Sequence, residues 1–527
     1  MGLRAVVVAG CGLLSLASVA CLQIPEDPAL SEPIDPRTDP PPNTPPAITS
    51  GVPAIGTVDL EVTADNGAGA DAAVSFGLPF PQGVLTNEKN VTLKNAAGQP
   101  VPISTSILAK WPGDGSIRSV LVVFKITLAA GANERWKVDY GTPTTSPDAG
   151  KLDPNPDGPV IATLAADFYS KSMASGILVP VAANSRFSSY DVEIAKSYAV
   201  IDYANYGARC DGGNNDRTYY DGPHAQYQRF LRTGNPKHLR SARTEARWFR
   251  DNELRWYASR SVAVSNCQPG GWTASVPLDW GALRRMLSQG MLDDYLLTGD
   301  PDAKATVVAM GEGYRRNLPA LTAGGSPVIE ITERNLGWPL MGLASYYAVD
   351  SRNEVRDALV SLVNRVVAWQ GRGDSGALEH DIERPDPEEC GSGPSGASPF
   401  MSSLVVDGMM DYWLLTADAA RVEPFMKKIA GWYEKSAITS DKKAFRYLWN
   451  CETEPYDDSS TADLNLLIVH VFGAAFALTR DKHWLEFGDT IADSGIENIF
   501  AKRPKQWNQS TRTFGKYLGY RAMGMKP

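Results

Sequence analysis

The pattern of apolar and polar residues changes once along the chain, from short alternating runs to longer helical periods. Between residues 51 and 145, turn-forming stretches such as Asn66-Gly67 and Gly113-Asp114-Gly115 separate short alternating runs. Six of these runs are typical of strands: Val58–Thr63, Ala72–Phe80, Val91–Asn95, Val101–Trp111, Ile117–Leu128 and Glu134–Tyr140. Strands this short and this closely spaced predict an antiparallel sandwich or small barrel. Pro, Asp, Gly and Thr then dominate residues 142–159, which are expected to serve as a linker, and residues 146–199 are expected to be the linker and entry segment before the second domain.

From residue 200 to residue 527 the apolar period is that of helices, and a short motif recurs. Each copy ends an apolar run and is followed by Asp or Asn, as in Tyr295-Leu296-Leu297-Thr298-Gly299-Asp300. The copies lie at intervals of about 50 to 70 residues, and they end at Asn235, Asp300, Asp350, Asp418 and Asp481. A Gly or small residue can end one helix, and the Asp or Asn can cap the next, so each copy predicts a helical hairpin.

The two helices of each predicted hairpin differ in polarity. The helix before the turn is almost continuously apolar, as in Leu404–Leu415 and Leu464–Leu478, whereas the helix after it is amphipathic, as in His238–Tyr257. Buried inner helices and half-exposed outer helices, repeated five or six times, predict an (α/α)5-6 toroid. A linear solenoid of hairpins is the alternative, but the long Gly-rich loops between units favour a closed ring. The predicted fold is therefore multidomain β plus all-α, with an N-terminal antiparallel β-barrel or sandwich followed by the toroid as the catalytic domain.

The N-terminus has the features of an exported lipoprotein. Residues 1–20 resemble a signal peptide, because Arg4 precedes an apolar run that is too short to span a membrane. Small residues lead into Cys21, as in a bacterial lipobox, which predicts lipidation of Cys21 and a membrane contact through this anchor. Cys11 is a second candidate with a shorter apolar run, and plain secretion after cleavage near Ala20 is the alternative. Residues 21–50 are rich in proline and predict a stiff tether, so the protein is expected at the cell surface or outer membrane, and otherwise secreted or periplasmic.

Export also suggests a role for the remaining cysteines. Cys210, Cys267, Cys390 and Cys451 lie in loops, and an even number in an exported chain predicts disulfides. Three pairings can be drawn, and pairing of neighbouring loops favours Cys210–Cys267 with Cys390–Cys451. No CxxC spacing points to a metal bound by these cysteines. The oxygen-rich stretch 211–216 suggests calcium as a cofactor, with a simple turn as the alternative, and no cofactor is predicted firmly.

The net charge of −9, with no dense run of Lys or Arg, argues against nucleic acid as a partner. In a toroid the loops that lead into the inner helices share one mouth, and there aromatic residues stand beside acids and arginines. The candidate catalytic residues in these loops are Tyr219, Tyr220, His224, Glu333, Arg334 and His380. The candidate substrate-binding residues are Arg217, Asp221, Trp272, Trp280, Asn335 and Tyr456.

Two reactions on sugars suit these residue types. Elimination at a uronic acid needs a base, a group that neutralises the carboxylate and an acid for the leaving oxygen, which Tyr, His and Arg can supply. Hydrolysis needs two carboxyl groups, and Glu333 with Asp221, Asp381 or Asp457 could provide them.

The β region resembles a known family at three places in order. These are Phe76-Gly77-Leu78-Pro79-Phe80-Pro81-Gln82-Gly83, Asn95-Ala96-Ala97-Gly98-Gln99-Pro100-Val101-Pro102 and Trp111-Pro112-Gly113-Asp114-Gly115-Ser116-Ile117-Arg118-Ser119-Val120. In this order they resemble the N-terminal RIFT-barrel domain of exo-acting rhamnogalacturonan lyases, with Gly113 inserted and Ser119 where that family has Trp. The resemblance implies a toroid after the barrel and a polysaccharide lyase that cleaves a uronic-acid-containing glycan. A glycoside hydrolase and a non-catalytic glycan-binding surface lipoprotein are the alternatives.

Overall fold

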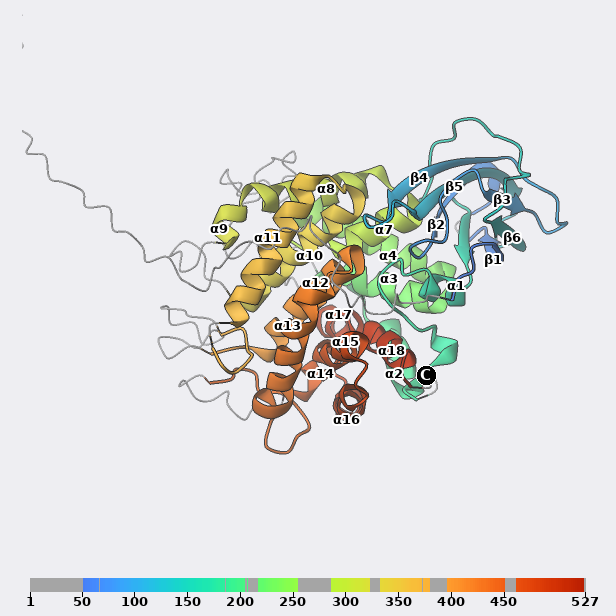
Figure 1. Ribbon diagram of the computed structural model, residues 1–527. Coiled ribbons are helices and arrows are strands. Elements are labelled where there is room, and N and C mark those ends of the chain that lie inside the picture. Colours follow the sequence, from blue (N-terminus) through green and yellow to red (C-terminus); the bar gives the residue numbers. More distant parts are fainter. Residues whose placement is uncertain are drawn as a thin grey trace, which may run out of the picture. The chain divides into compact units, whose positions relative to one another are not determined.

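The computed structural model describes residues 51–65, 67–184, 186–203, 206, 217–254, 286–322, 332–371, 373–379, 396–450 and 461–525 (Figure 1). The chain divides into two units, residues 1–44 and residues 45–527. All the described residues belong to the second unit.

The first part of this unit consists of two antiparallel sheets. One has the order β3-β6-β1-β7 and the other β2-β5-β4, with β1 Gly56–Thr63, β2 Gly69–Pro79, β3 Val91–Lys94, β4 Ile103–Lys110, β5 Ile117–Leu128, β6 Asn133–Tyr140 and β7 Ile161–Leu164. Alternate residues of β1 and β6 are buried, and the rings of Phe124 in β5 and Trp136 in β6 join the two sheets at 5.1 Å between centroids. The six predicted strands are thus confirmed.

Residues 146–199, expected to be a linker and entry segment, contain regular structure. The strand β7 pairs antiparallel with β1, from Leu60 opposite Leu164 to Thr63 opposite Ile161. Two helices follow, α1 Ala166–Lys171 and α2 Ser188–Val200. All four residues of β7 are buried, so the strand has no alternating pattern by which the sequence could reveal it.

The helical hairpins follow in the predicted order. They are α3 Gly222–Thr233 with α4 Pro236–Phe249, α7 Gln289–Thr298 with α8 Pro301–Arg316, α10 Glu333–Val349 with α11 Asn353–Gln370, α12 Pro399–Thr416 with α13 Ala419–Trp432, and α14 Asn465–Ile468 plus α15 His470–Thr479 with α16 His483–Glu497. The predicted caps are present: the Asn235 side chain accepts from Lys237 N at 2.9 Å, and that of Asp300 accepts from Asp302 N at 2.8 Å. The chain ends with α17 Pro504–Thr511 and α18 Phe514–Ala522.

The first and last helices of this region complete a closed ring. The outer helix α2 packs against α17, where Trp507 Nε1 donates to Ile194 O at 3.1 Å and Tyr190 OH donates to Ser510 O at 3.1 Å. On its other side α17 meets the start of α3, because Asn508 Nδ2 donates to Arg217 O at 3.1 Å. Within the described residues the inner helices therefore follow one another as α3, α7, α10, α12, α14–α15 and α17–α18, and back to α3. This closure confirms the toroid and excludes the linear solenoid.

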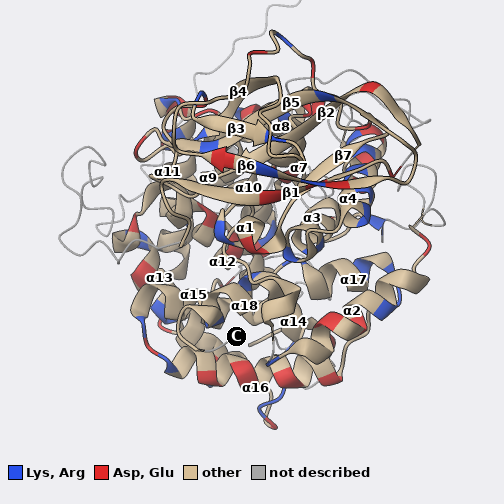
Figure 2. Cartoon of the chain, turned by 90° about the vertical axis from the view of Figure 1, so that its right-hand side faces the viewer, with Lys and Arg blue, Asp and Glu red and all other residues tan. Residues whose placement is uncertain are grey.

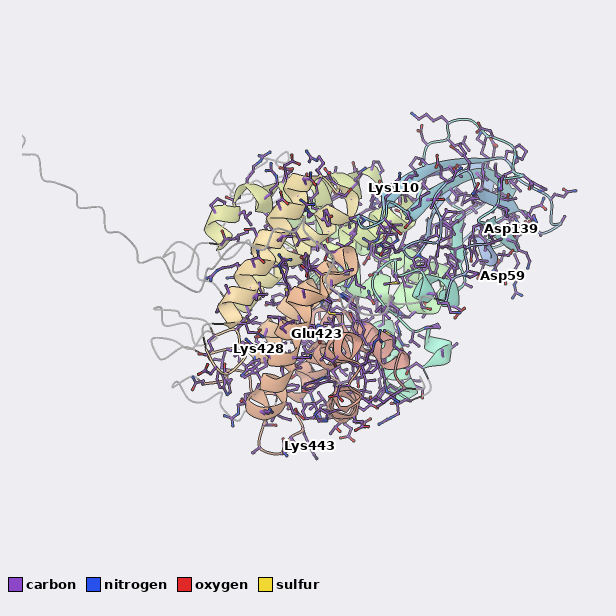
Figure 3. The ribbon with its side chains drawn as sticks, in the orientation of Figure 1. Asp59, Lys110, Asp139, Glu423, Lys428 and Lys443 are labelled. Atoms are coloured by element: carbon purple, nitrogen blue, oxygen red, sulfur yellow. The ribbon has the colours of Figure 1, made fainter. Side chains whose placement is uncertain are left out.

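The outer helices carry most of the charge. Figure 2 shows acidic and basic residues along α16 and α2, and Figure 3 shows Glu423 and Lys428 on the outer helix α13. In contrast, the inner stretch Ala462–Thr479 is long and apolar enough to cross a membrane, but 89% of it is buried inside the protein, as an inner helix requires. It is the one such helix among the described residues.

The β domain docks on the C-terminal ends of the inner helices. Ser119 Oγ donates to Leu296 O of α7 at 2.7 Å, and Tyr295 OH donates to Leu108 O at 2.8 Å. A Cβ on Gly77 of β2 would lie 2.0 Å from Leu296 O, so the strand and the helix end approach as closely as a glycine allows. The β domain thus lies at the end of the ring opposite the loops that lead into the inner helices.

Candidate functional site

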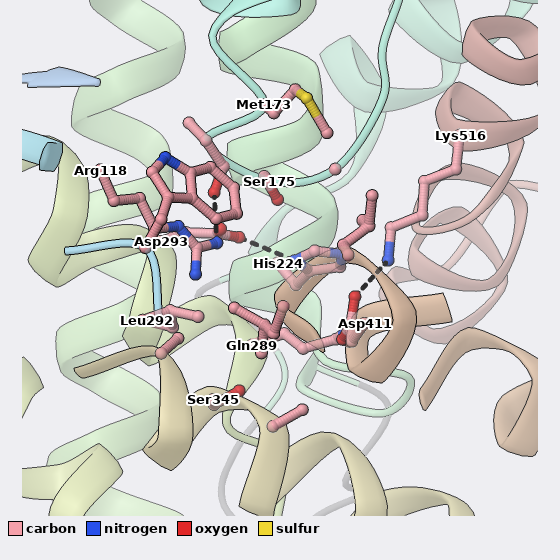
Figure 4. Close-up of a pocket in the computed structure, with 17 residues that line it drawn as sticks. Arg118, Met173, Ser175, His224, Gln289, Leu292, Asp293, Ser345, Asp411 and Lys516 are labelled. Atoms are coloured by element: carbon pink, nitrogen blue, oxygen red, sulfur yellow. Dashed lines mark hydrogen bonds and ion pairs between the residues drawn. The ribbon is translucent and has the colours of Figure 1, made fainter. Parts of the chain in front are cut away.

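A pocket lies inside the ring, on the side that faces the β domain (Figure 4). Its walls come from the β domain, from the segment 173–176 and from five inner-helix segments. The lining side chains that the following argument uses are Trp111, Arg118, Ser175, His224, Gln289, Asp293, Asp411 and Lys516. Leu292, Ala344, Ala348, Leu414 and Leu415 add an apolar wall.

The pocket contains a buried histidine that is held by a carboxyl group. His224 Nδ1 lies 2.7 Å from Asp293 Oδ2, and both side chains are buried. Burial lowers the pKa of His224 well below its ordinary value and raises the pKa of Asp293 well above its own. His224 is therefore uncharged at neutral pH, which is the state that can accept a proton.

The free ring nitrogen of His224 faces an amide whose hydrogens are already in use. His224 Nε2 lies 3.5 Å from Gln228 Nε2, which donates to Ser175 O at 3.0 Å and to Ser175 Oγ at 2.7 Å. When Nδ1 donates to Asp293, Nε2 therefore carries a lone pair, as a general base requires.

An unusual backbone turn positions His224. Tyr220 and Asp221 have φ values of 62° and 56°, both in the left-handed region that non-glycine residues rarely adopt. The turn lets Asp221 cap α3, since its side chain accepts from His224 N at 3.2 Å and from Gly290 N at 3.2 Å. Strained turns of this kind persist only where surrounding contacts hold them, and they are common at functional sites.

A buried ion network lies beside the pocket and reaches it through Lys516 and Gln289. Asp407 of α12 accepts from Arg512 Nη2 at 2.7 Å and from Lys516 Nζ at 2.6 Å. Burial alone would raise the pKa of Asp407, but Lys516 and Arg512 hold it below its ordinary value. Asp411 lies one turn further along α12 and accepts from Gln289 Nε2 at 2.7 Å. Burial, reinforced by the charge of Asp407, raises the pKa of Asp411, which favours its protonated form.

Three of the predicted catalytic residues meet on the other side of this network. Arg334 Nη1 donates to Tyr219 OH at 3.2 Å, and the rings of Tyr219 and Tyr220 lie 4.5 Å apart. Lys505 Nζ lies 5.0 Å from the Tyr219 ring. Burial, with the neighbouring Tyr219, raises the pKa of Tyr220 well above its ordinary value, so its hydroxyl stays protonated.

The other predicted residues serve different contacts. Arg217 forms two hydrogen bonds to Glu245, at 2.8 and 2.9 Å, and so ties the start of α3 to α4. Glu333 is fully buried and accepts from Ser398 N at 2.7 Å, between α10 and α12. Asn335 is buried in the first turn of α10. Of the predicted site residues that the structure describes, His224 is the one that lines the pocket.

Several predictions concern residues outside the described part of the chain. These are His380, Asp381, Trp272, Trp280, Tyr456, Asp457, the stretch 211–216, the cysteines Cys210, Cys267, Cys390 and Cys451, and the whole N-terminal segment with Cys11 and Cys21. Lipidation, the disulfides and the calcium site therefore stay predictions. Among the described residues, no group of three or more His, Cys, Asp or Glu could hold a metal ion.

The sequence analysis did not select most of the residues that line the pocket, although the sequence contains signals for them. Trp111 and Arg118 lie in the most specific of the three family-like stretches, at its first and eighth positions. Asp293 and Asp411 interrupt almost continuously apolar inner helices, where an acid is costly unless it has a partner or a function. An acidic residue on the apolar face of a predicted inner helix could therefore have identified these two pocket residues.

The comparison with protein families identifies the β domain. Residues 57–120 match the PcRGLX-like N-terminal RIFT barrel domain. Residues 57–120 are thus similar to this RIFT barrel domain, as the three sequence stretches predicted. No curated protein sequence matches the chain significantly.

The chain also matches solved structures of carbohydrate-active enzymes at low sequence identity. An unsaturated glucuronyl hydrolase specific for heparin matches with a TM-score of 0.47 and 13% identity, covering 64% of this chain and 96% of the other. A sugar epimerase from a ruminal bacterium has a TM-score of 0.43 and 13% identity, covering 58% and 86%. A polysaccharide lyase has a TM-score of 0.39 and 10% identity, covering 58% and 91%.

Proposed function

We propose that this protein is a carbohydrate-active enzyme that cleaves a uronic-acid-containing glycan by β-elimination. The observation that carries the proposal is the His224–Asp293 pair inside the pocket of a closed helical ring. The RIFT barrel over residues 57–120 supports it, because the same stretch resembles that of rhamnogalacturonan lyases.

The pocket offers the two proton-transfer groups that elimination needs. His224 Nε2 takes the proton from the carbon next to the uronate carboxylate, while Asp293 keeps the imidazole in the reactive tautomer. The electron pair of that C–H bond forms the new double bond, and the bond to the leaving oxygen breaks. Asp411, whose pKa is raised by burial, donates a proton to that oxygen from its protonated form.

Ultraviolet absorbance tests this reaction directly. Incubation with uronic-acid polymers should produce the conjugated double bond of an unsaturated uronate, and a neutral glucan should give no such signal. His224→Gln should lower kcat by about 10²- to 10⁴-fold, since it removes the base. His483→Gln is the matched control, because His483 is half exposed on the outer helix α16 and should leave kcat unchanged. Full activity of His224→Gln would exclude His224 as the base.

Asp293→Asn tests how the histidine is held. The amide would donate to His224 Nδ1 and place the ring proton on Nε2, where it blocks the base, so kcat should fall strongly with little change in KM. The pH profile gives a second measurement. Because burial lowers the pKa of His224, the acidic limb of kcat/KM should lie below pH 6.5. A limb at or above that value would assign the base to another group.

Hydrolysis is a second candidate, because Asp293 and Asp411 place two carboxyl groups in the same pocket. A hydrolase would release reducing ends without ultraviolet absorbance, and Asp411→Asn would abolish that release. Binding of a glycan with no product from any polymer would instead select a non-catalytic glycan-binding protein. The membrane anchor at Cys21 is a separate proposal, and mass spectrometry of the mature N-terminus would test it.

A further inference from the structure

Arg118 of the β domain brings unused hydrogen-bond donors into the ring pocket. Its side chain is 93% buried, since its exposed fraction is 7%. Nη2 donates to Ala174 O at 3.3 Å, whereas Nε and Nη1 are buried with no acceptor in the described structure. Its Cζ lies 4.8 Å from the ring centroid of Trp111, and Figure 4 shows Arg118 among the lining residues of the pocket.

A buried guanidinium with unused donors is costly in the free protein, so it points to an absent acceptor. The other lining cation, Lys516, is occupied, because it binds Asp407 at 2.6 Å and lies 4.0 Å from Asp411. Asp293 and Asp411 are close enough to act on Arg118 through their charge, but neither forms an ion pair with it among the described residues. Asp293 is already held by His224 at 2.7 Å, and Asp411 accepts from Gln289, which leaves Arg118 as the cation available to a ligand.

We propose that Arg118 binds the carboxylate of the uronic acid residue in this pocket, so that the β domain supplies the group that recognises the substrate. The inference rests on the proposed function for the identity of the sugar, but the binding of the anion does not depend on the reaction. The pocket is matched to such a ligand, because Leu292, Ala348 and Leu414 form an apolar wall beside the cation. A uronate has the same combination, an apolar ring face and one charged group.

Binding of monosaccharides to the full-length protein tests the proposal without any turnover. Ligand-detected NMR titrations would compare D-galacturonate and D-glucuronate with D-galactose and D-glucose, and also with galactose 6-sulfate. The wild-type protein should prefer at least one uronate to its neutral sugar by about 10-fold or more, the effect of one charge-assisted hydrogen bond. Arg118→Met should reduce this preference to within about twofold, and Arg118→Lys should retain part of it.

Matched controls separate binding from folding. Arg135→Gln changes an exposed arginine of β6 in the same domain and should keep the preference of the wild type. Thermal unfolding of each variant would show whether it is folded. If Arg118→Met does not fold, the uronate preference of Arg118→Lys decides the test.

Two results would overturn the proposal: a wild type that binds uronates and neutral sugars equally, or an Arg118 variant that is folded and keeps the full preference. Tighter binding of the sulfated sugar than of either uronate would also overturn it, because the site would then be selective for sulfate. Loss of the uronate preference in Arg118→Met would support the proposal even if the enzyme proved to be a hydrolase. Elimination activity without carboxylate preference would instead support the proposed function and refute the role of Arg118.

Discussion

Single residues at the helix ends of the ring show how closely local geometry follows the repeated motif. In four of the five hairpins the residue that ends the inner helix has a positive φ, at Gly234, Gly299, Ala417 and Arg480, with values of 64°, 77°, 57° and 61°, whereas α10 ends at the extended residue Asp350. The conformation is the same in all four hairpins, but only two of them have the residue that adopts it without strain. The motif therefore specifies the turn, and the fold imposes it where the side chain is unfavourable.

Replacing Arg480 with glycine should stabilise the protein. The left-handed conformation at φ 61° costs a non-glycine residue about 1 kcal/mol, and glycine removes most of that cost. We expect Arg480→Gly to raise the free energy of unfolding by about 0.5 kcal/mol, measured by urea denaturation. Gly299→Ala is the opposite test, because its Cβ would meet Leu121 Cδ1 at 2.6 Å, and it should destabilise the protein. If both substitutions changed the free energy of unfolding in the same direction and by the same amount, this explanation would be wrong.

A buried histidine should make the protein less stable in acid. His470 Nδ1 lies 2.9 Å from Leu467 O, and burial lowers the pKa of His470 to about 4. Because the unfolded chain binds a proton near pH 6.5 and the folded one does not, stability is lost as the pH falls from 6.5 towards 4. The contribution is on the order of 3 kcal/mol at the acidic end.

His470→Leu measures this contribution. The variant should lose less stability than the wild type between about pH 6.5 and pH 4.5, by urea denaturation at each pH. Val192→Leu is the control, since Val192 is half exposed and does not titrate, and its loss should equal that of the wild type. If the free energy of unfolding of His470→Leu changed with pH as steeply as that of the wild type, His470 would not be the group that titrates.

At the scale of elements, the sequence predicts what is local and misses what is paired at a distance. Six strands and five hairpins follow from alternation, helical period and cap residues, all of which are short-range signals. The strand β7 and the pairing of α2 with α17 escaped prediction because their partners lie far away in the sequence. Only the assembled fold brings the N-terminal helix α2 into the ring as the outer partner of the last inner helices.

The same limit applies to the candidate site. The sequence correctly placed His224 near the start of an inner helix, but it could not show that Asp293 of the next inner helix holds this histidine. Nor could periodicity reveal that Trp111 and Arg118, which are remote in the chain, line the same pocket. Pockets at the junction of domains depend on tertiary contacts, and these have no signature in the local pattern.

Asn508 tests the closure of the ring. Its side chain donates to Arg217 O at 3.1 Å and to Tyr219 O at 3.0 Å, joining α17 to the turn before α3. Asn508→Ala would leave both carbonyls buried without these donors, and we expect it to lower the free energy of unfolding by about 2 to 4 kcal/mol. Asn498→Ala removes an exposed asparagine at the end of α16 and should cost less than about 1 kcal/mol. If both substitutions lowered the free energy of unfolding by a similar amount, the contact between α17 and the turn before α3 would have no special role in stability.

At the scale of the whole described unit, the β domain and the helical ring act as one structure around the pocket. The Ser119 hydroxyl binds the end of α7 directly, and Arg118 beside it enters the pocket. The small side chain at this position gives α7 room to approach the sheet.

Gly77 offers the sharpest test of that contact. A Cβ at this position would lie 2.0 Å from Leu296 O and 2.8 Å from Leu297 Cα, both backbone atoms of α7 that cannot rotate away. We expect Gly77→Ala to destabilise the protein by about 1 to 3 kcal/mol. It should also weaken uronate binding, because moving the β domain moves Arg118.

Gly431→Ala in the outer helix α13 is the matched control, since its Cβ meets nothing within 4 Å. This variant should leave uronate binding unchanged and stabilise the protein slightly. Calorimetry with the same NMR titrations would measure both effects, and a Gly77→Ala variant that is destabilised but binds normally would show that the pocket does not depend on how the β domain is docked.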